Sequence, residues 1–374
     1  MAWKVVICMQ NETKKPIKVA HVIGMAIDGG TESVWINYYR NIDRTKVQFD
    51  FLVESESKII NKQEIESLGG HVVIIPPYKK LFKYMKELKR IFKENQYDIV
   101  HSNMNALSVF TLRAAKKAGI KVRIAHSHST SNKKEWKKNI VKNMLRPLSK
   151  KYATHYYACS EHAGRWLFGN KTFDKGLVKI IYNAIDLERF NFNQENRDLI
   201  RKEYNIEDKY VIGHVGRFMQ QKNHVFLIDV FNEFQKTRND AVLLLIGDGP
   251  LKEELFNKVN ELNVQDKVIF GGVHKDVEKY YSAMDSFLFP SIYEGLGMTL
   301  VEAQVNGLPC LASNFIPKEA IVDTNTKLLE LDITKWIQNM NDLNRTNSKN
   351  CDISKYDIKK KAIDLVEGYY SILD

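Results

Sequence analysis

The sequence predicts an α/β protein made of two doubly wound parallel sheets. Strand-like runs alternate with helix-like runs along the whole chain, which is the pattern of parallel sheets covered by helices. The chain has 374 residues, more than a single hydrophobic core usually supports, so two domains are expected. Its hydrophobic content of 44% is ordinary for a globular chain.

Short apolar runs mark the strands of the first half. The first of them leads to Gly29 and Gly30 and then to a run with helical character. No place is assigned to residues 1–15, which are interpreted as a flexible extension, as an added sequence, or as an extra strand over residues 4–9. The strands of this half are expected at residues 17–23, 49–53, 71–75, 99–101 and 122–126.

In the second half, the predicted strands end in glycine-containing or proline-containing turns. A helix with one apolar face is expected at residues 224–234, and another begins after Gly297. The strands are expected at residues 211–215, 241–246, 268–270 and 285–289. Because parallel strands bring their carboxyl ends to one edge of a sheet, these turns are expected to meet where open α/β sheets bind ligands.

The expected domain boundaries follow from these runs. A polar stretch at residues 191–208 is interpreted as the connection between the domains. A last helix at about residues 356–373 is expected to return to the first domain. The predicted parts are residues 1–15, a first domain at 16–190, a second domain at 191–354 and the returning helix at 355–374.

Two glutamates eight residues apart, Glu294 and Glu302, flank a glycine-rich turn. Gly295 and Gly297 allow a ligand to approach the backbone, and the helix after this turn leaves its first N–H groups without partners. Those groups are the N–H groups of Gly297, Met298 and Thr299. Together with the helix dipole they favour an anion such as a diphosphate, while Glu294 suits a sugar hydroxyl and Glu302 a ribose diol. The alternative is a plain turn with two solvated glutamates.

Two cations lie on one predicted loop. Arg217 and Lys222 follow the strand at residues 211–215 and precede a helix. A pyrophosphate leaving group requires such cations because negative charge grows on it as the glycosidic bond breaks. The Gly-Asp-Gly-Pro turn around Asp248 ends the next strand, so it is expected beside this loop.

Four motifs in this order and spacing resemble those of family 4 of the retaining GT-B glycosyltransferases. They are Gly216-Arg-Phe-x-x-x-Lys222-Asn, Ile246-Gly-Asp-Gly-Pro-Leu, Phe270-x-Gly and Glu294-x7-Glu302. The resemblance extends from about Lys18 to Asp374, and the part after residue 306 is most similar to the bacterial exopolysaccharide and capsule branch. It implies two Rossmann-like domains facing a cleft, with a C-terminal helix that crosses back to the N-terminal domain.

The resemblance also implies an activity and its residues. The activity is transfer of a hexose or N-acetylhexosamine from a nucleotide diphosphate sugar, preferably a UDP-sugar, to a saccharide or lipid-linked saccharide, with retention at the anomeric carbon. No metal or other cofactor is implied. The implied catalytic residues are Glu294, His128, Arg217 and Lys222. The implied donor-binding residues are Gly29, Gly30, Gly216, Arg217, Lys222, Asp248, Val273, Glu294, Gly295, Leu296, Gly297, Met298, Thr299 and Glu302. For the glycine pair, a simple strand–helix turn is the alternative.

The residues implied on the acceptor side or in the cleft are His101, His126, Ser160 and Asn183. His128 matches a family histidine near the transferred sugar, and His126 is the second candidate. Their i, i+2 spacing also suggests a metal site, but no third ligand is evident nearby. Ala184 stands where similar enzymes carry glycine, so a different loop is expected if that position requires positive φ.

Charge is divided unevenly along the chain. Residues 1–150 hold 28 Lys/Arg against 13 Asp/Glu, a net charge of +15, whereas residues 151–374 carry −4. Two lysine-rich runs at residues 79–93 and 133–146 are interpreted either as ordinary outer helices or as a surface for anionic lipid. A nucleic-acid partner is not expected, because the sequence has no aromatic-rich platform, zinc finger or RNA-binding signature.

The expected location is the cytoplasm, with peripheral attachment to the inner face of the cytoplasmic membrane. No run of about 18 apolar residues is present, and the N-terminus lacks the features of a secretory signal. Four scattered cysteines without a Cys-x-x-Cys pair favour neither zinc nor a disulfide framework. Two alternative functions remain open: a sugar-nucleotide epimerase of similar fold, and a binding protein that keeps the fold without the chemistry.

Overall fold

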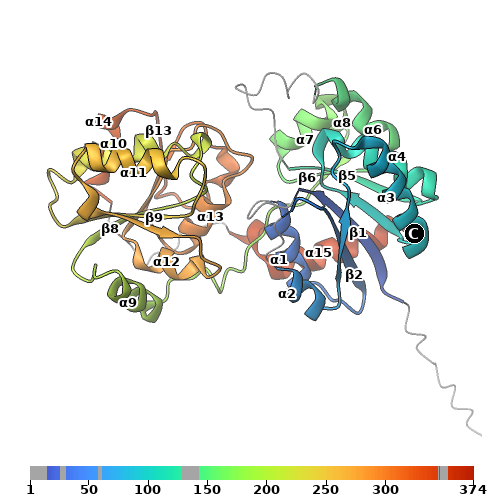
Figure 1. The fold of residues 1–374 in the computed structure, drawn as a ribbon, viewed down its shortest axis with the longest axis horizontal. Helices are drawn as coiled ribbons and strands as arrows, with labels where there is room; N and C mark the ends of the chain where they lie inside the picture. The colour runs from blue at the N-terminus through green and yellow to red at the C-terminus, as the bar shows by residue number, and fades with distance from the viewer. Residues whose placement is uncertain (1–14, 26–30, 58–60, 129–142, 344, 346–352) are drawn as a thin grey trace, which may run out of the picture. The chain divides into compact units, whose positions relative to one another are not determined.

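The computed structural model describes residues 15–25, 31–57, 61–128, 143–343, 345 and 353–374. These residues form two parallel sheets with helices around them (Figure 1). They divide into two compact units, one from Met1–His126, Leu145–Tyr156 and Ala362–Asp374, the other from Ser127–Met144 and Tyr157–Lys361. The extra strand considered for residues 4–9 lies outside the described residues, as does most of the basic run at 133–146.

The first sheet has seven strands in the order β3-β2-β1-β4-β5-β6-β7. Its strands are β1 (Ile17–Gly24), β2 (Val47–Glu54), β3 (His71–Ile75), β4 (Ile99–Ser102), β5 (Val122–Ser127), β6 (His155–Ala158) and β7 (Val178–Ile180). The helices along this part of the chain are α1 (Thr31–Asn41), α2 (Lys62–Ser67), α3 (Leu81–Asn95), η1 (Asn105–Leu107), α4 (Ser108–Ala118), η2 (Arg146–Leu148), α6 (Ser149–Tyr152), α7 (Glu161–Phe168) and α8 (Asn170–Asp174). The five strands expected here are confirmed, each within two residues of its predicted ends.

Apolar side chains of the helices cover this sheet. On one face, Trp35 of α1 packs on His21 of β1 with ring centroids 4.2 Å apart. Helix α3 buries Tyr84, Leu88, Ile91 and Phe92. The hydroxyl group of Tyr84 shares a hydrogen bond of 2.8 Å with that of Thr111 on α4. The interpretation of residues 79–93 as an outer helix with one packed face is therefore confirmed.

The C-terminal helix α15 (Ile358–Ser371) returns to the first sheet, as expected. Tyr356, just before the helix, is fully buried in the core of the second unit. Near the other end of the helix, the Tyr369 hydroxyl contacts Nδ1 of His101 at 2.8 Å and Nε2 of His21 at 3.3 Å. These hydrogen bonds fix the last turns of α15 against strands β1 and β4.

The second sheet has six strands in the order β10-β9-β8-β11-β12-β13. Its strands are β8 (Tyr210–Val215), β9 (Ala241–Ile246), β10 (Val268–Gly272), β11 (Ser286–Phe289), β12 (Cys310–Ser313) and β13 (Lys327–Leu329). The helices are α9 (Gln194–Glu203), η3 (Gln220–Lys222), α10 (His224–Phe234), α11 (Lys252–Glu261), η4 (Gln265–Lys267), α12 (Val277–Ala283), α13 (Met298–Val305), η5 (Lys318–Ala320), α14 (Ile333–Met340) and η6 (Ser354–Tyr356). The four strands predicted from apolar runs are confirmed, and so are the helices at 224–234 and after Gly297.

Alternate residues of the central strands face two separate hydrophobic cores. In β9, Leu243 and Leu245 pack with α10, α11 and α14. Leu244 and Ile246 instead pack with α12 and α13 on the opposite face. Figure 1 shows α10 and α11 along one side of this sheet and α12 along the other. A strand buried on both faces must be apolar at every position, which is why these strands were readable from the sequence.

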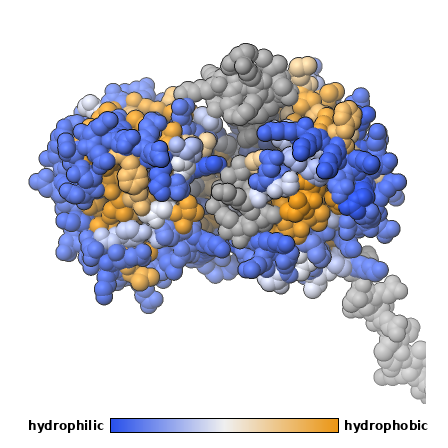
Figure 2. Space-filling model, viewed as in Figure 1, coloured by the Kyte–Doolittle hydropathy of each residue, from blue (hydrophilic) through white to orange (hydrophobic). Residues whose placement is uncertain are grey.

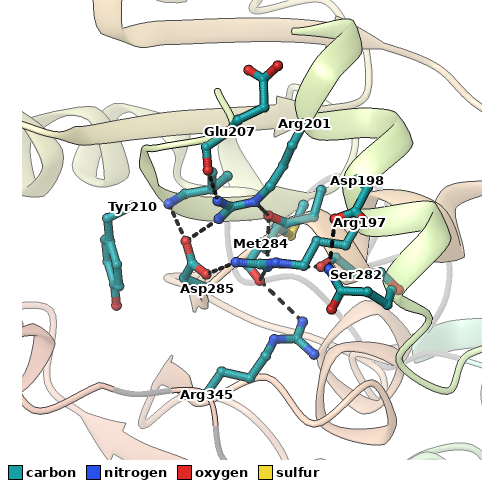
Figure 3. A network of polar contacts seen from close by, with 12 residues as sticks. Arg197, Asp198, Arg201, Glu207, Tyr210, Ser282, Met284, Asp285 and Arg345 are labelled. Atoms are coloured by element: carbon teal, nitrogen blue, oxygen red, sulfur yellow. Dashed lines mark hydrogen bonds and ion pairs between the residues drawn. The ribbon is translucent and has the colours of Figure 1, made fainter. Parts of the chain in front are cut away.

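The polar stretch at residues 191–208 contains a helix, α9, that the sequence analysis did not predict. Arg197 and Arg201 of α9 form ion pairs with Asp285 at 2.6 and 2.5 Å (Figure 3). Arg345 approaches the same region and donates to the carbonyl oxygen of Met284 at 3.2 Å. This arginine network ties α9 to the start of β11 through two of the helix's polar residues.

Candidate functional site

Three turns meet at the carboxyl edge of the second sheet. The N–H of Phe218, after β8, donates to the carbonyl oxygen of Asp248, after β9, at 2.9 Å. The N–H of Gly247 donates to the carbonyl oxygen of Gly272, at the end of β10, at 2.7 Å. Gly247 has φ +141, and a Cβ there would lie 2.1 Å from the carbonyl oxygen of Gly216. Only glycine therefore allows these turns to stack this closely.

The N-terminus of α13 is open. Gly297 precedes the helix with φ +94 and provides no side-chain cap. Its carbonyl oxygen accepts from the N–H of Leu300 at 3.0 Å. No hydrogen bond to a described residue involves the N–H groups of Met298 and Thr299, and the buried Thr299 Oγ1 also has no partner among these residues. The geometry matches the predicted anion-binding helix terminus, with the neighbouring Leu296 buried.

Lys222 and Glu294 form an ion pair beside this helix. The Nζ atom of Lys222 lies 2.8 Å from Oε1 of Glu294, with side-chain exposures of 14% and 8%. The ammonium group also lies 4.9 Å from the ring centroid of Phe289. The structure thus brings together two residues predicted from separate motifs.

A third residue, Gln221, holds the same carboxylate and was missed by sequence reasoning. Its Nε2 donates to Oε2 of Glu294 at 3.2 Å and to the carbonyl oxygen of Tyr293 at 3.0 Å. Gln221 directly precedes Lys222 in the short helix η3. Its position next to a predicted cation was the only signal in the sequence, and a glutamine there has no chemistry that distinguishes it from a surface residue.

Arg217 and Asp248 lie at the exposed rim of the stacked turns. Arg217 makes no hydrogen bond or ion pair with the described residues, so its guanidinium group is available to a ligand. The Asp248 carboxylate accepts from the N–H of Gly249 at 2.6 Å and from Nζ of Lys252 at 3.2 Å. These two bonds, the first the stronger, hold the pKa of Asp248 below its ordinary value. Asp248 therefore shapes its own turn.

Glu302 lies in α13 and is bound by Tyr281 of α12. The Tyr281 hydroxyl lies 2.8 Å from Oε2 of Glu302 and 3.2 Å from the carbonyl oxygen of Thr299. Burial raises the pKa of Glu302 to about 7, while the hydrogen bond from Tyr281 and the positive charge of Lys222 oppose this rise. A carboxyl group with this pKa exchanges its proton near neutral pH.

The turn after β10 presents an apolar side chain. Val273 is 58% exposed, directly after Gly272 with φ +80. Beside it, His274 Nε2 lies 2.6 Å from the carbonyl oxygen of Gly271, and its ring also contacts the Tyr280 hydroxyl. These contacts fix the His274 ring next to the exposed Val273 in the chain.

Two of the predicted histidines are buried in the first unit. His101 shares a hydrogen bond with Nδ1 of His126 at 2.9 Å, and its other ring nitrogen contacts Tyr369. The rings of His101 and His126 stack with centroids 5.1 Å apart. Both side chains are almost fully buried, at 0% and 1% exposure. They link strand ends to the C-terminal helix, and a direct contact with substrate stays a prediction.

His128 follows the end of β5 and is only partly buried. Its carbonyl oxygen accepts from Sγ of Cys159 at 3.5 Å. Burial of the ring lowers the pKa of His128 to about 3. The imidazole is therefore neutral over the physiological range, and it can donate or accept a hydrogen bond but brings no positive charge.

Ser160, Asn183 and Ala184 lie in the other unit. The hydroxyl group of Ser160 caps α7 by accepting from the N–H of Ala163 at 3.2 Å. Asn183 has a buried Oδ1 without a partner among the described residues. Ala184 has no positive φ, so alanine causes no strain there. The roles of Ser160 and Asn183 toward an acceptor stay predictions.

The part of the chain that the structure describes contains no metal site and has a cavity away from the turns. No group of three or more His, Cys, Asp or Glu side chains there is arranged to hold a metal ion. A cavity of about 360 Å³ lies against the arginine network, at the amino ends of β8 and β11, so it is separate from the turns at the carboxyl edge. Gly29 and Gly30 lie outside the described residues.

Comparison with known proteins identifies the family. Residues 28–189 match the family model described as Glycosyltransferase Family 4, and residues 196–345 match the one described as Glycosyl transferases group 1. The putative glycosyltransferase EpsF of Bacillus subtilis is 36% identical over 315 residues, which cover 83% of this chain and 82% of EpsF. The chain belongs to glycosyltransferase family 4. This confirms the family that the four motifs predicted.

Two further relatives extend this result. An Escherichia coli protein named UDP-Gal:alpha-D-GlcNAc-diphosphoundecaprenol alpha-1,3-galactosyltransferase is 24% identical over 342 residues, or 89% of this glycosyltransferase and 87% of that protein. The crystal structure of Anabaena HepE in complex with UDP-glucose superposes with a TM-score of 0.77 at 20% identity, covering 95% of this chain and 100% of HepE. The HepE likeness confirms the predicted fold of two Rossmann-like sheets.

Proposed function

We propose that this glycosyltransferase moves a hexose or N-acetylhexosamine from a UDP-sugar to a saccharide or lipid-linked saccharide during synthesis of a bacterial surface polysaccharide. The transfer retains the anomeric configuration and requires no metal ion. The observation that carries the proposal is the convergence of the three glycine turns, the Lys222–Glu294 pair and the open N-terminus of α13 at one sheet edge. The names of the E. coli galactosyltransferase and of the HepE complex support the choice of UDP and of a lipid-linked acceptor.

The donor diphosphate lies against α13 in this proposal. The free N–H groups of Met298 and Thr299 donate to the diphosphate, and the helix dipole adds to their attraction. Lys222 and the exposed Arg217 supply positive charge from the neighbouring loop. These groups stabilise the diphosphate most when it leaves, because its charge is then largest. They perform the neutralisation that a divalent cation would otherwise supply.

The transfer itself exchanges one bond for another. The acceptor oxygen forms a bond to the anomeric carbon on the face from which the phosphate oxygen departs, and the carbon–phosphate-oxygen bond breaks. The proton of the acceptor hydroxyl passes to the departing phosphate oxygen. No protein base is needed for this step, which agrees with the lowered pKa of His128, because an imidazole with a pKa of about 3 is a weak base.

The two glutamates bind the two sugars of the donor. Glu294, near the N-terminus of α13, accepts hydroxyl groups of the transferred sugar, and Glu302 accepts the ribose diol from within the helix. Val273 offers its exposed side chain to the uracil ring. The resulting order along the sheet edge is base, ribose, diphosphate and sugar, which places the reacting carbon beside Glu294.

The lipid-linked acceptor implies that the protein works at the cytoplasmic face of the membrane. No helix among the described residues has the length and apolar character needed to cross a bilayer. Helix α3 offers a different contact, because Phe82 is 93% exposed at its first turn beside the lysines at positions 79, 80, 83 and 86. Figure 2 shows that hydrophilic residues cover most of the surface in view. An exposed aromatic ring among lysines is suited to an anionic lipid surface.

The activity is tested with a panel of UDP- and GDP-sugars, membrane extract as acceptor and EDTA throughout. The expected result is nucleotide release with sugar transfer from one donor, and an α-linked product from an α-linked donor. Analysis of the recovered sugar nucleotide separates this from epimerisation, which changes the sugar without releasing nucleotide. Loss of activity in EDTA that returns with Mg²⁺ would contradict metal independence, and absence of nucleotide binding would favour a binding protein.

Membrane attachment is tested by sedimentation with vesicles of phosphatidylglycerol and phosphatidylcholine. Binding is expected to fall in the Phe82→Ser variant and with rising salt concentration, because both the aromatic contact and the charge attraction contribute. Phe256→Ser is a control, since Phe256 is also exposed, at 41%, but lies in the second unit. Equal binding of all three proteins would contradict the role of α3.

A further inference from the structure

The Glu294 carboxylate is occupied at both oxygens before any donor is present. Lys222 Nζ contacts Oε1 at 2.8 Å, and Gln221 Nε2 contacts Oε2 at 3.2 Å. Glu294 is also largely removed from water, with 8% of its side chain exposed. A buried carboxylate that loses a partner without replacement is destabilised, so Oε1 needs another donor whenever Lys222 moves away.

Two hydrogen bonds to backbone carbonyl oxygens hold the two loops in this arrangement. The N–H of Ile292 donates to the carbonyl oxygen of Gln221 at 2.9 Å. The side chain of Asn223 donates to the carbonyl oxygen of Pro290 at 3.3 Å. These bonds involve neither the Lys222 ammonium group nor the Glu294 carboxylate. The loops can therefore stay joined while the ammonium group changes its partner.

The two residues that hold the carboxylate differ in their freedom. Gln221 is anchored a second time, through the carbonyl oxygen of Tyr293 at 3.0 Å. Lys222 carries its charge at the end of a flexible stem and contacts the Phe289 ring, which does not fix its direction. An incoming diphosphate attracts the ammonium group strongly but has no comparable hold on a neutral amide.

We propose that donor binding exchanges the partner of Lys222, from Glu294 to the diphosphate, while Gln221 keeps the Glu294 carboxylate in place for the sugar. The inference rests on the proposed function and deepens it. The Oε1 atom that Lys222 leaves is then filled by a hydroxyl group of the transferred sugar. Gln221 acts as a positioning residue, because it reaches the sugar only through Glu294.

The exchange makes the site distinguish a nucleotide sugar from a nucleotide. UDP draws Lys222 away but offers no hydroxyl group to Oε1, so a buried carboxylate oxygen is left without a partner. A UDP-sugar restores that hydrogen bond. The ion pair therefore disfavours retention of UDP after transfer, because it re-forms when UDP leaves. A free sugar, which has no diphosphate to draw Lys222 away, cannot bind Glu294 while the ion pair is present.

The first experiment measures UDP affinity by isothermal titration calorimetry in four proteins: wild type, Glu294→Gln, Lys222→Met and the double variant. Glu294→Gln is expected to bind UDP roughly fivefold to twentyfold more tightly, because Lys222 no longer has to leave a carboxylate. In the Lys222→Met background the same substitution is expected to change UDP affinity by less than about twofold. The UDP-sugar that turns over is expected to gain nothing from Glu294→Gln.

The double variant separates an exchange from simple repulsion. If Glu294 only repels the diphosphate through space, Glu294→Gln improves UDP binding equally with or without Lys222, and that result overturns the proposal. Unchanged or weaker UDP binding by Glu294→Gln overturns it as well. Circular dichroism and thermal unfolding of each variant establish that it is folded.

The second experiment tests Gln221 against a matched neighbour. Gln221→Leu is expected to lower kcat/KM for the UDP-sugar roughly tenfold while leaving UDP affinity within about twofold of wild type. Gln220→Leu is the control, because Gln220 lies in the same short helix and is exposed. Equal effects of the two substitutions, or parallel losses of UDP and UDP-sugar binding in Gln221→Leu, would overturn the positioning role.

Failure of the proposed function gives a different result. Wild-type protein that binds no nucleotide in the panel would contradict the function. In that case inorganic pyrophosphate replaces UDP as the probe of the Lys222 exchange. Tighter pyrophosphate binding by Glu294→Gln, but not by the double variant, would support the exchange, and equal binding by all four proteins would overturn it.

Discussion

Donor binding is predicted to depend on pH through Glu302. Burial raises its pKa to about 7, and the Tyr281 hydroxyl opposes the rise by hydrogen bonding to the carboxylate. A ribose diol donates two hydrogen bonds, so the ionised carboxylate is its better partner. We therefore expect kcat/KM for the donor to increase as the pH rises through about 7. The perturbations are pH itself and the variants Tyr281→Phe and Glu302→Gln.

The size of the effect follows from the pKa of the carboxyl group. With a pKa of about 7, roughly nine tenths of Glu302 is ionised at pH 8 and roughly one tenth at pH 6, so kcat/KM should fall about tenfold between these values. Tyr281→Phe removes a hydrogen bond that lowers this pKa, and the midpoint should move upward. Glu302→Gln should lower kcat/KM and remove the pH dependence near 7.

His128, His214 and His224 do not produce the same profile. Burial lowers the pKa of His128 to about 3 and that of His214 to about 3, so neither ring gains a proton between pH 6 and 8. His224 is shifted in the same direction, to about 2. The diphosphate of a UDP-sugar has no titration in this range either. Loss of the midpoint in Glu302→Gln therefore assigns the titration to Glu302.

The assay is initial-rate kinetics at subsaturating donor in a constant-ionic-strength buffer series, with the acceptor held saturating. A midpoint near 7 that survives in Glu302→Gln would refute the reasoning, as would a Tyr281→Phe midpoint below that of wild type.

Ionisation of the same carboxyl group also affects the free energy of unfolding. Because its folded pKa is raised, its contribution to stability should decline as the pH rises from about 4.5 to about 7.

Three further changes have expected outcomes. Gly247→Ala places a Cβ 2.1 Å from the carbonyl oxygen of Gly216, so the stacked turns must separate. UDP affinity, measured by calorimetry, should fall at least about tenfold. An unchanged affinity would contradict the assigned role of the turns. Asp285→Asn leaves two paired guanidinium groups without their carboxylate. The free energy of unfolding of the second unit, measured in urea, should fall by about 3 kcal/mol. A fall below about 1 kcal/mol would indicate that water replaces the pair. Tyr369→Phe removes the hydrogen bond to His101 and should lower the unfolding free energy of the first unit by about 1 kcal/mol. Hydrogen exchange of strands β1 and β4 would measure this loss. Unaltered exchange would contradict the anchoring of α15.

Most of the strands that the sequence revealed are buried on both faces, although the partly buried edge strands β3 and β10 were also predicted from their apolar runs. Leu243, Leu244 and Leu245 are apolar because helices cover both sides of β9, and such a run is visible without any tertiary information. Strands β6, β7, β12 and β13 were missed. They have three or four residues each, and β7 and β13 lie at sheet edges. Helix α9 was hidden by its polar composition, since its arginines bind Asp285 rather than water.

The sequence by itself determined the family, the two-sheet fold, and the donor motifs with Glu294, Lys222 and Gly297. Spacing within a motif suffices there, because a strand, a turn and a helix start follow one another in the chain. Only the tertiary structure decided which of these groups touch. The pairing of Lys222 with Glu294, the hold of Gln221 on the same carboxylate, and the contact of Tyr281 with Glu302 join residues 21 to 73 positions apart. Hydrogen bonds and burial act over a few ångströms in space. The protonation and pairing of these side chains can therefore be inferred only from the folded structure.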